Sequence, residues 1–167
     1  MEDMCQLTER LTEHKYQGSY EQIGKAIARY SQNPGLDLVN LFEQVLFAFL
    51  TGNADMHLKN FSLIDHPGSG YMLSPAYDHV STALVMEGDD EDLALALNGK
   101  KKKINRKDFM QAMSRFDISD RAKENVFSKV EPLLPAWKDL TSISFLSGEK
   151  KEKFNQLLSE RWSRIFE

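Results

Sequence analysis

One stretch of the chain, Thr51 to Ser62, gathers a carboxylate, an imidazole, an ammonium and a carboxamide within a few residues of one another. Asp55 precedes Asn60 by five residues, and Asp78 follows Asp55 by 23 residues. Phosphoryl transfer needs one carboxylate that orients the attacking hydroxyl, and an amide oxygen with a second carboxylate that hold magnesium. The spacing is that of a kinase catalytic loop and its metal site. We therefore predict Asp55 as the catalytic base, with Asn60 and Asp78 binding magnesium and, through it, the nucleotide.

Two further side chains between these positions carry groups that suit the same reaction. His57 and Lys59 supply an imidazole and an ammonium. Hydrogen-bond donors and positive charge contribute most where negative charge develops on the transferring phosphoryl group. We therefore expect His57 and Lys59 to assist catalysis.

Each of these residues also has a purely structural interpretation. Asp55 could be a loop residue or an N-cap, Asn60 a turn former, and Asp78 the cap of a helix that begins near Ser81. A hydrolase metal site built from His57 and the two aspartates is a rival chemistry, but it lacks a second ligating histidine. We favour phosphoryl transfer because separate structural interpretations do not explain why a strongly apolar segment ends in a loop that carries Asp55, His57, Lys59 and Asn60 together. The other histidines show no metal-ligand spacing and are expected at the surface or in caps: His14, His66 and His79.

The apolar segment 36–50 precedes the candidate loop and must position it. Its apolar residues recur at helical spacing on more than one face, which predicts a deeply buried helix. The helix should end at Thr51-Gly52-Asn53, because glycine and asparagine tolerate the left-handed conformation of a helix C-terminus. The predicted helix would thus present Asp55 on a loop that is anchored in the core.

Two short apolar segments, 61–64 and 71–74, follow the loop and are joined by a turn-rich connection. They are typical of a β-hairpin. A hairpin brings together the residues that flank it. We therefore expect Asp78 to lie beside Asp55 and Asn60.

The remaining segments are predicted mainly as helices. Residues 1–18 show no clear period and should form a short helix or loop. Ser19 with Gln22 has the pattern of a capping box, and the helix after it should stop at Asn33-Pro34-Gly35. Three later helices should follow Asn105, run from Ser119 to Pro135, and extend from Gly148 to the end of the chain.

Two charged runs lie between the hairpin and these later helices. The acidic run 87–92 lacks the pattern of a calcium loop and is interpreted as a solvated loop. Segments 93–97 and 100–104 are predicted as two strands around an Asn98-Gly99 turn. The lysines at 100–103 should protect an exposed edge strand, although they could instead meet a phosphate backbone or an acidic partner.

Composition limits the class of protein. With 167 residues, 41% of them hydrophobic and 28% charged, the chain can bury one core, and we expect a single domain, mainly α with small β-hairpins. A net charge of −4 gives no general reason to bind nucleic acid. Cys5 is the only cysteine and is expected as a buried free thiol. The acidic N-terminus and the lack of a long apolar run predict a soluble cytoplasmic protein without membrane contact.

The residues around Asp55 and Asp78 resemble those of HipA-like serine/threonine kinases, the toxins of bacterial toxin–antitoxin modules. The similarity is carried by the runs from Leu50 to Leu63 and from Leu73 to Asp78, in which the aspartates, histidine and asparagine coincide with the family's motif. Weaker similarity covers most of the rest of the chain: 2–6, 15–16 and 95–100.

That resemblance implies both a fold and a set of roles. Asp55 would be the catalytic base, Asn60 and Asp78 would bind Mg²⁺, and the fold would be the mostly helical C-terminal lobe of a kinase-like enzyme that uses ATP. It also implies a protein substrate of the translation machinery, a small DNA-binding antitoxin as partner, and operator DNA contacted through that complex.

One part of a kinase is missing from the sequence. The nine glycines never form GxGxxG or GxxxxGK[ST], and no strand lysine of a nucleotide-binding lobe can be identified. We expect residues 1–167 to be the C-terminal lobe of a longer kinase, with little or no activity without its N-terminal lobe. The alternative function is a non-catalytic binding module that contacts an antitoxin or DNA through the lysines at 100–103.

Overall fold

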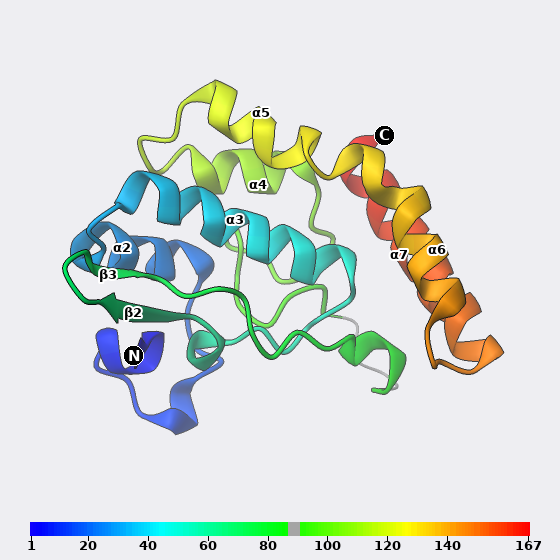
Figure 1. Cartoon of the computed structure of the whole chain (residues 1–167), viewed down its shortest axis with the longest axis horizontal. Coiled ribbons are helices and arrows are strands. Elements are labelled where there is room, and N and C mark those ends of the chain that lie inside the picture. Colours follow the sequence, from blue (N-terminus) through cyan, green and yellow to red (C-terminus); the bar gives the residue numbers. More distant parts are fainter. Residues whose placement is uncertain (87–90) are drawn as a thin grey trace.

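A computed structural model describes residues 1–86 and 91–167. Figure 1 shows helices stacked above a small sheet, with a helical hairpin at the C-terminal end of the molecule. The strands and α-helices are β1 (Glu2–Asp3), α1 (Met4–Leu7), α2 (Tyr20–Tyr30), α3 (Pro34–Leu50), β2 (Ser62–His66), β3 (Gly70–Leu73), α4 (Arg106–Met113), α5 (Asp120–Ser128), α6 (Leu134–Ile143) and α7 (Gly148–Phe166). Short 3₁₀ turns are η1 (Thr12–His14), η2 (Leu58–Asn60), η3 (Thr82–Leu84) and η4 (Glu131–Leu133). The predicted mainly helical fold is confirmed.

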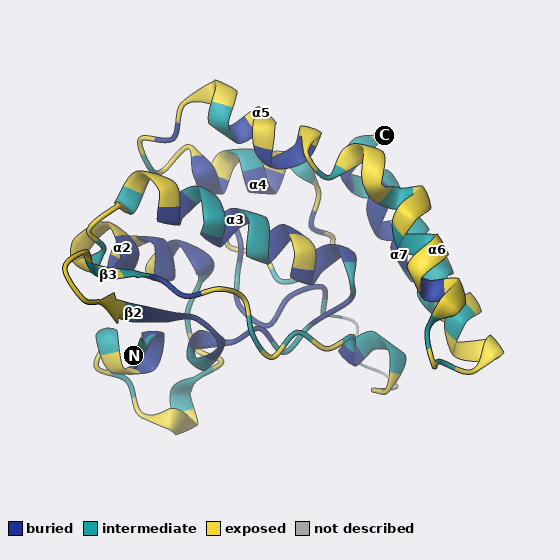
Figure 2. Ribbon diagram, in the orientation of Figure 1, coloured by how far each residue is buried: buried dark blue, intermediate teal, exposed yellow. Residues whose placement is uncertain are grey.

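Helix α3 is the centre of the core. The side chains of its last three turns that face the interior, from Leu41 to Leu50, are wholly buried, and α2 packs along the helix. In Figure 2, buried bands alternate with intermediate and exposed ones along α3, as expected for a helix with one face toward the core. Gly52 follows with a φ of +71°. The prediction of a buried helix that ends in a left-handed glycine is confirmed, since only glycine adopts that conformation without strain.

The start of α2 and the gap before α3 are set by local caps. The Ser19 hydroxyl accepts a hydrogen bond from the Gln22 backbone, as predicted, but the Gln22 side chain accepts one from Arg10 instead of completing a capping box. The helix ends at Tyr30, and Asn33 with Pro34 then begins α3 rather than merely ending α2. Proline fits the first turn of a helix because its missing N–H would have no partner there.

The sheet is antiparallel, with the order β1-β2-β3. The β2–β3 hairpin has the predicted position, with Leu63 opposite Leu73. Strand β1 pairs Glu2 with Leu63 on the other edge of β2, and was not predicted because two residues are too few to show alternation. Cys5 is buried just after it, as expected.

The two strands predicted at 93–97 and 100–104 are wrong. Asn98 and Gly99 do form a tight turn, both with positive φ, but the pairing is a single bridge between Leu97 and Lys100. Alternate leucines in this segment are buried, and so is Ala94 between them, so both sides of the chain are enclosed. The apolar residues of this segment are therefore explained by burial of the chain on both sides, and not by a strand with one solvent-exposed face. The lysines therefore do not protect an edge strand.

The acidic run is only partly described, because residues 87–90 lie outside the described residues. Asp92, at its end, is buried rather than solvated, which corrects the prediction for this residue. Its carboxylate binds the guanidinium groups of Arg161, at 3.1 Å, and Arg164, and accepts a hydrogen bond from the Ile104 backbone at 2.9 Å. Burial raises the pKa of Asp92, but the hydrogen bonds and the positive charges of the arginines lower it by more. The net pKa therefore lies below the ordinary value of an aspartate.

The C-terminal third contains one more helix than predicted. The caps at Asn105 and Ser119 are confirmed, and α7 begins at Gly148. The helix from Ser119 stops at Ser128, and Pro135 lies in the first turn of α6 instead of ending a helix. Helices α6 and α7 pack against each other and form the hairpin at the edge of Figure 1. Across the described residues, no helix combines the length and apolarity that crossing a membrane requires.

We predict that Asp92→Ala will lower the free energy of unfolding by about 3–5 kcal/mol, because it leaves the buried Arg161 and the half-buried Arg164 without their carboxylate. Urea denaturation at neutral pH measures this. The folded pKa of Asp92 is below its unfolded value, so its contribution is complete at neutral pH and is lost as the pH falls below about 3.9. Asp139→Ala is the control, since Asp139 is exposed, and it should change stability by less than about 0.5 kcal/mol. Equal effects of the two substitutions would contradict this role of Asp92.

Candidate active site

The loop from Asn53 to Asn60 starts directly at the buried end of α3. Asn53 is fully buried; its backbone N–H donates to Ala48 at 2.8 Å, and its side-chain oxygen accepts the Asp55 N–H at 3.0 Å. The Thr82 hydroxyl accepts the Ala54 N–H at 2.9 Å. The start of the loop is therefore fixed by side chains, because regular helix bonding has ended there.

The far side of the loop is held by residues from the N-terminal part of the chain. The buried Tyr20 hydroxyl donates to the Met56 carbonyl at 3.1 Å. The Leu58 N–H donates to the Lys15 carbonyl at 3.1 Å. These two contacts join α2 and the segment before it to the loop, so that its polar backbone stays paired inside the protein.

The structure brings Asp55, Asn60 and Asp78 together. The Asn60 side-chain amide donates to Asp78 Oδ2 at 3.2 Å and approaches the Asp55 carbonyl at 3.4 Å. Asn60 is buried, Asp55 is half-buried and Asp78 is exposed, so a buried amide lies between two residues that solvent can reach. The hairpin therefore brings Asp78 back beside Asn60, as expected.

Asp78 has a φ of +56°, in the left-handed region that non-glycine residues rarely adopt. Such a conformation costs free energy and is retained where the surrounding structure enforces it, often at functional sites. A carboxylate beside a carboxamide is a donor set that suits Mg²⁺, which usually keeps several waters and needs few protein ligands. The residues present therefore fit that ion.

A site made of histidine and aspartates alone has less support. In residues 1–86 and 91–167, no group of three or more His, Cys, Asp or Glu side chains is arranged to hold a metal ion. The hydrolase-like combination of His57 with Asp55 and Asp78 is thus not formed.

Tyr16 is a member of the site that the sequence did not reveal. Its hydroxyl donates to Asp55 Oδ1 at 2.5 Å, and its ring meets the His57 ring edge-on at 5.0 Å. Burial, the hydrogen bond to Asp55 and the charge of that carboxylate raise the pKa of Tyr16 to about 12, which keeps the phenol a donor at neutral pH. No short-range pattern links two residues that lie 39 positions apart.

His57 is buried, and its Nδ1 has no hydrogen-bond partner among the described residues. Burial, followed by the nearby positive charge of Lys15, lowers the pKa of His57. The imidazole is therefore neutral at neutral pH. It can donate one hydrogen bond there, but it does not supply positive charge.

Lys59 forms its ion pair away from Asp55 and Asp78. Its ammonium pairs with Asp3 of β1 at 3.0 Å, and the hydrogen bond and charge of Asp3 raise the pKa of Lys59. The Tyr77 hydroxyl donates to the Lys59 carbonyl at 2.7 Å. Lys59 thus joins the loop to the sheet, and its ion pair is not with Asp55 or Asp78.

The other histidines differ from one another in environment. His66 is exposed, and the side chain of His14 is 43% exposed, so both lie near the surface as expected. His79 does not: both ring nitrogens are buried without a partner in the described structure, and the ring packs on Phe47 at 5.2 Å. Burial lowers the pKa of His79. The prediction that His79 lies at the surface or in a cap is wrong, because it could not take account of packing on Phe47, which is distant in sequence.

Comparisons with known proteins agree with this geometry. The family model described as "HipA-like C-terminal domain" matches residues 1–137. The "Putative kinase Y4dM" of Sinorhizobium fredii is 34% identical over 130 residues, which are 77% of this chain and 29% of that protein. The serine/threonine-protein kinase toxin HipA of Shewanella oneidensis is 37% identical over 73 residues, which are 44% of this chain and 16% of the toxin. The matched segments thus span less than a third of the length of these relatives.

Two solved structures share the fold. The Shewanella oneidensis HipA, solved with HipB and its operator DNA, superposes with a TM-score of 0.82 at 21% identity and covers 98% of this chain and 43% of that one. The Helicobacter pylori proinflammatory kinase CtkA superposes with a TM-score of 0.63 at 18% identity and covers 98% of this chain and 64% of that one. Both are kinase-like folds, which confirms the predicted fold class.

We predict that Tyr20→Phe will lower the free energy of unfolding by about 1–2 kcal/mol, because it leaves the buried Met56 carbonyl without a donor. Amide hydrogen exchange should also become faster from residue 54 to residue 60, where that bond restrains the loop. Tyr30→Phe is the matched control, since Tyr30 is 37% exposed and should change stability by less than about 0.5 kcal/mol. Unchanged exchange in the loop would show that Tyr20 does not hold it.

Proposed function

We propose, from the premise that the chain belongs to the family of HipA-like C-terminal domains, that it is the catalytic-loop lobe of an ATP- and Mg²⁺-dependent serine/threonine protein kinase. The observation that carries the proposal is the meeting of Asp55, Asn60 and Asp78 around one buried amide at the end of α3. Two carboxylates and an amide with separate roles are the minimum that phosphoryl transfer asks of this lobe.

Asp55 is proposed as the catalytic base. Tyr16 donates to one of its oxygens, which fixes the carboxylate, and the other oxygen can accept the proton of a serine or threonine hydroxyl. A base has to lie within hydrogen-bond distance of that hydroxyl, so a fixed carboxylate saves orientational entropy. His57, neutral and next to Tyr16, is proposed to donate a hydrogen bond near the transferring group; Lys59 was expected to act there too, but its ion pair favours a role in holding the loop.

Asn60 and Asp78 are proposed to hold magnesium and, with it, the nucleotide. They would hold the ion where it could neutralise charge on the phosphates of the nucleotide. The Asn60 amide nitrogen donates to Asp78 Oδ2, which keeps the two side chains adjacent before any ion arrives. This reduces the cost of assembling the two ligands.

Residues 1–167 are proposed as one helical domain whose nucleotide-binding lobe is not contained in this chain. The sequence has no glycine-rich phosphate loop, and the relatives are more than three times its matched length. The Asp78 carboxylate alone gives a nucleotide few contacts. We therefore expect little or no kinase activity from the isolated chain.

The toxin role and the partners are proposals by similarity. The related HipA of Shewanella oneidensis was solved with HipB and operator DNA. By the family resemblance, we propose a small DNA-binding antitoxin and, through it, operator DNA as partners, and a protein of the translation machinery as substrate. The enzyme would act in the bacterial cytoplasm.

The alternative, a non-catalytic module that binds through its lysines, has less support from the contacts. Lys100 pairs with Asp108 at 2.9 Å, and Lys101 pairs with Glu91 at 3.2 Å. Ammonium groups that are already paired are less available to a phosphate backbone. We therefore retain the kinase as the single proposed function.

We predict that Asp55→Asn and Asp78→Asn, each made in a protein that joins this lobe to its nucleotide-binding lobe, will lower the rate of phosphoryl transfer at least about 100-fold. Transfer from radiolabelled ATP to a protein acceptor measures it. Asp65→Asn is the control, since Asp65 is exposed on β2 and should leave the rate unchanged.

A second readout separates the two aspartates. Calorimetric titration with Mg²⁺–ADP should show weaker binding for Asp78→Asn and unchanged binding for Asp55→Asn, because Asp78 is the one of these two aspartates that is proposed to touch the ion. Full activity in both variants would rule out the mechanism.

A further inference from the structure

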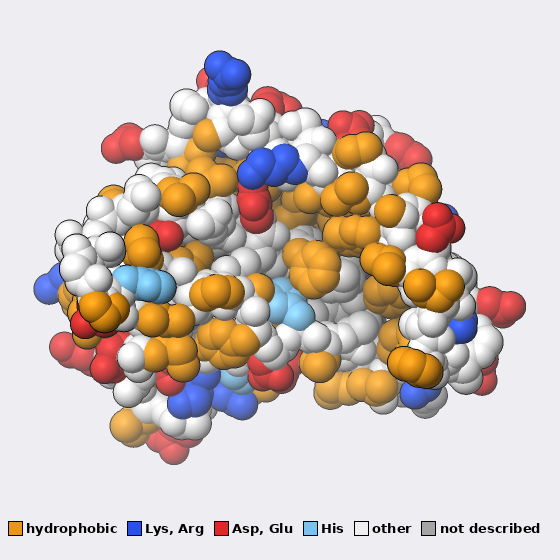
Figure 3. Space-filling view, in the orientation of Figure 1, with side chains coloured by type: hydrophobic (Ala, Val, Ile, Leu, Met, Phe, Trp, Pro, Cys, Tyr) orange, Lys and Arg blue, Asp and Glu red, His pale blue; other side chains and the backbone are white. Residues whose placement is uncertain are grey.

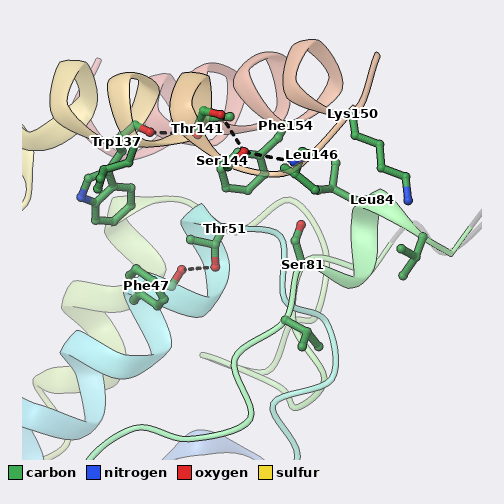
Figure 4. Close-up of a pocket in the computed structure, with 13 residues that line it drawn as sticks. Phe47, Thr51, Ser81, Leu84, Trp137, Thr141, Ser144, Leu146, Lys150 and Phe154 are labelled. Atoms are coloured by element: carbon green, nitrogen blue, oxygen red, sulfur yellow. Dashed lines mark hydrogen bonds between the residues drawn. The ribbon is translucent and has the colours of Figure 1, made fainter. Parts of the chain in front are cut away.

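An apolar groove opens beside the candidate active site. Its floor is the last turn of α3, one wall is the segment after Asp78, and the other wall is the α6–α7 hairpin. Figure 4 shows these three parts around one hollow, and apolar side chains gather around a hollow at the same end of the molecule in Figure 3. The volume is about 800 Å³. Side chains that line it include Phe47, Val80, Leu84, Trp137, Leu140 and Phe154.

The apolar surface extends beyond the groove itself. Leu140 and Val85, which line it, are 62% and 69% exposed. Their neighbours Ile143 and Met86 are 78% and 54% exposed. A continuous apolar area of this kind costs free energy in water and marks an interaction site. Because exposed apolar side chains continue beyond the groove, this surface favours a protein partner.

The polar groups of the groove restrict the conformation of what binds there. The hydroxyls of Thr51, Thr141 and Ser144 donate to carbonyls of their own helices or turns. An extended peptide would bring unpaired N–H and C=O groups into a wall that has few partners left for them. A helix has satisfied its own backbone and can present an apolar face. The groove is therefore suited to a helix.

Two groups remain for polar side chains of the partner. Ser81 Oγ is buried and has no hydrogen-bond partner in the described structure. Among the described residues that line the groove, Lys150 is the only charged one, and no contact between described residues pairs its ammonium with a carboxylate. A lone ammonium at the edge of an apolar surface is complementary to an acidic side chain.

We propose that this groove binds an amphipathic helix of a protein partner, which places its apolar face on α3, α6 and α7 and an acidic side chain against Lys150. The groove adjoins the segment that carries Asp78, because Val80 and Ser81 line it and follow Asp78 by two and three residues. A helix bound there would contact that segment. The proposal concerns binding and does not require that the lobe be active.

The test uses the chain as it stands and a defined probe. The probe is a fluorescein-labelled helical peptide of about 18 residues, with leucines at i, i+3, i+4 and i+7 and one glutamate beside that face. A second peptide carries lysine in place of the glutamate. Fluorescence anisotropy gives the dissociation constants. We expect saturable binding of the glutamate peptide and binding of the lysine peptide that is weaker by about fivefold.

Two matched pairs of variants locate the binding. Leu140→Asp should weaken binding of the glutamate peptide at least about tenfold, whereas Leu11→Asp, at a position that is 66% exposed and outside the groove, should leave it unchanged. Lys150→Glu should reverse the preference between the two peptides, whereas Lys153→Glu, also on α7 but outside the groove lining, should not. All four positions are at the surface, and circular dichroism checks that each variant is folded.

Several results would overturn the proposal. They are the absence of saturable binding below about 1 mM, equal binding by Leu140→Asp and Leu11→Asp, and no reversal in Lys150→Glu. Sedimentation that shows a dimer abolished by Leu140→Asp would assign the groove to a second copy of the chain, and direct binding of decanoate without any peptide binding would assign it to a small amphiphile. Asp55→Asn should bind the peptide normally, so loss of the proposed kinase function would leave this test unaffected.

Discussion

The last turn of α3 buries Ala48, Phe49 and Leu50 completely, yet the chain must leave it as a polar loop. Every N–H and C=O group of that loop then needs a partner at a depth where water is scarce. The partners come from widely separated segments: the Asn53 side chain, the Thr82 hydroxyl, the Tyr20 hydroxyl and the Lys15 carbonyl. The path of the loop, and so the place of Asp55, is a consequence of this requirement.

Features that depend on neighbouring residues could be predicted from the sequence. The caps at Ser19, Asn105 and Ser119 use bonds over three residues, and the left-handed Gly52 follows from the end of an apolar helix. The hairpin, with its turn-rich connection, also predicted that Asp78 would return to Asn60. Each of these depends on local geometry, for which the rules of caps, turns and periodicity are sufficient.

Features that depend on long-range packing could not be predicted from the sequence. Alternating leucines between Asp92 and Asn98 look like a strand, but their surroundings bury both sides. Asp92 looked solvated because Arg164 lies 72 residues away. The same limit applies to the site. Tyr16 binds Asp55, which is 39 residues away in sequence, and Lys59 binds Asp3, which is 56 residues away. Spacing identified the residue types that the chemistry needs, and only the fold could identify the groups that hold them.

Gly52 connects the loop to the C-terminal hairpin. A Cβ at this position would lie 2.5 Å from Leu157 Cδ2 of α7 and 3.0 Å from the Ala83 side chain, so α7 and the segment after Asp78 both close on the turn from which the loop starts. Residues 138–167 lie outside the family match, which ends at 137. They nevertheless pack against the element that positions Asp55, and with α3 they form the apolar groove. A partner that presses α7 toward or away from Gly52 would therefore act on the same turn that fixes the catalytic loop, because that turn has no space in which to absorb the movement.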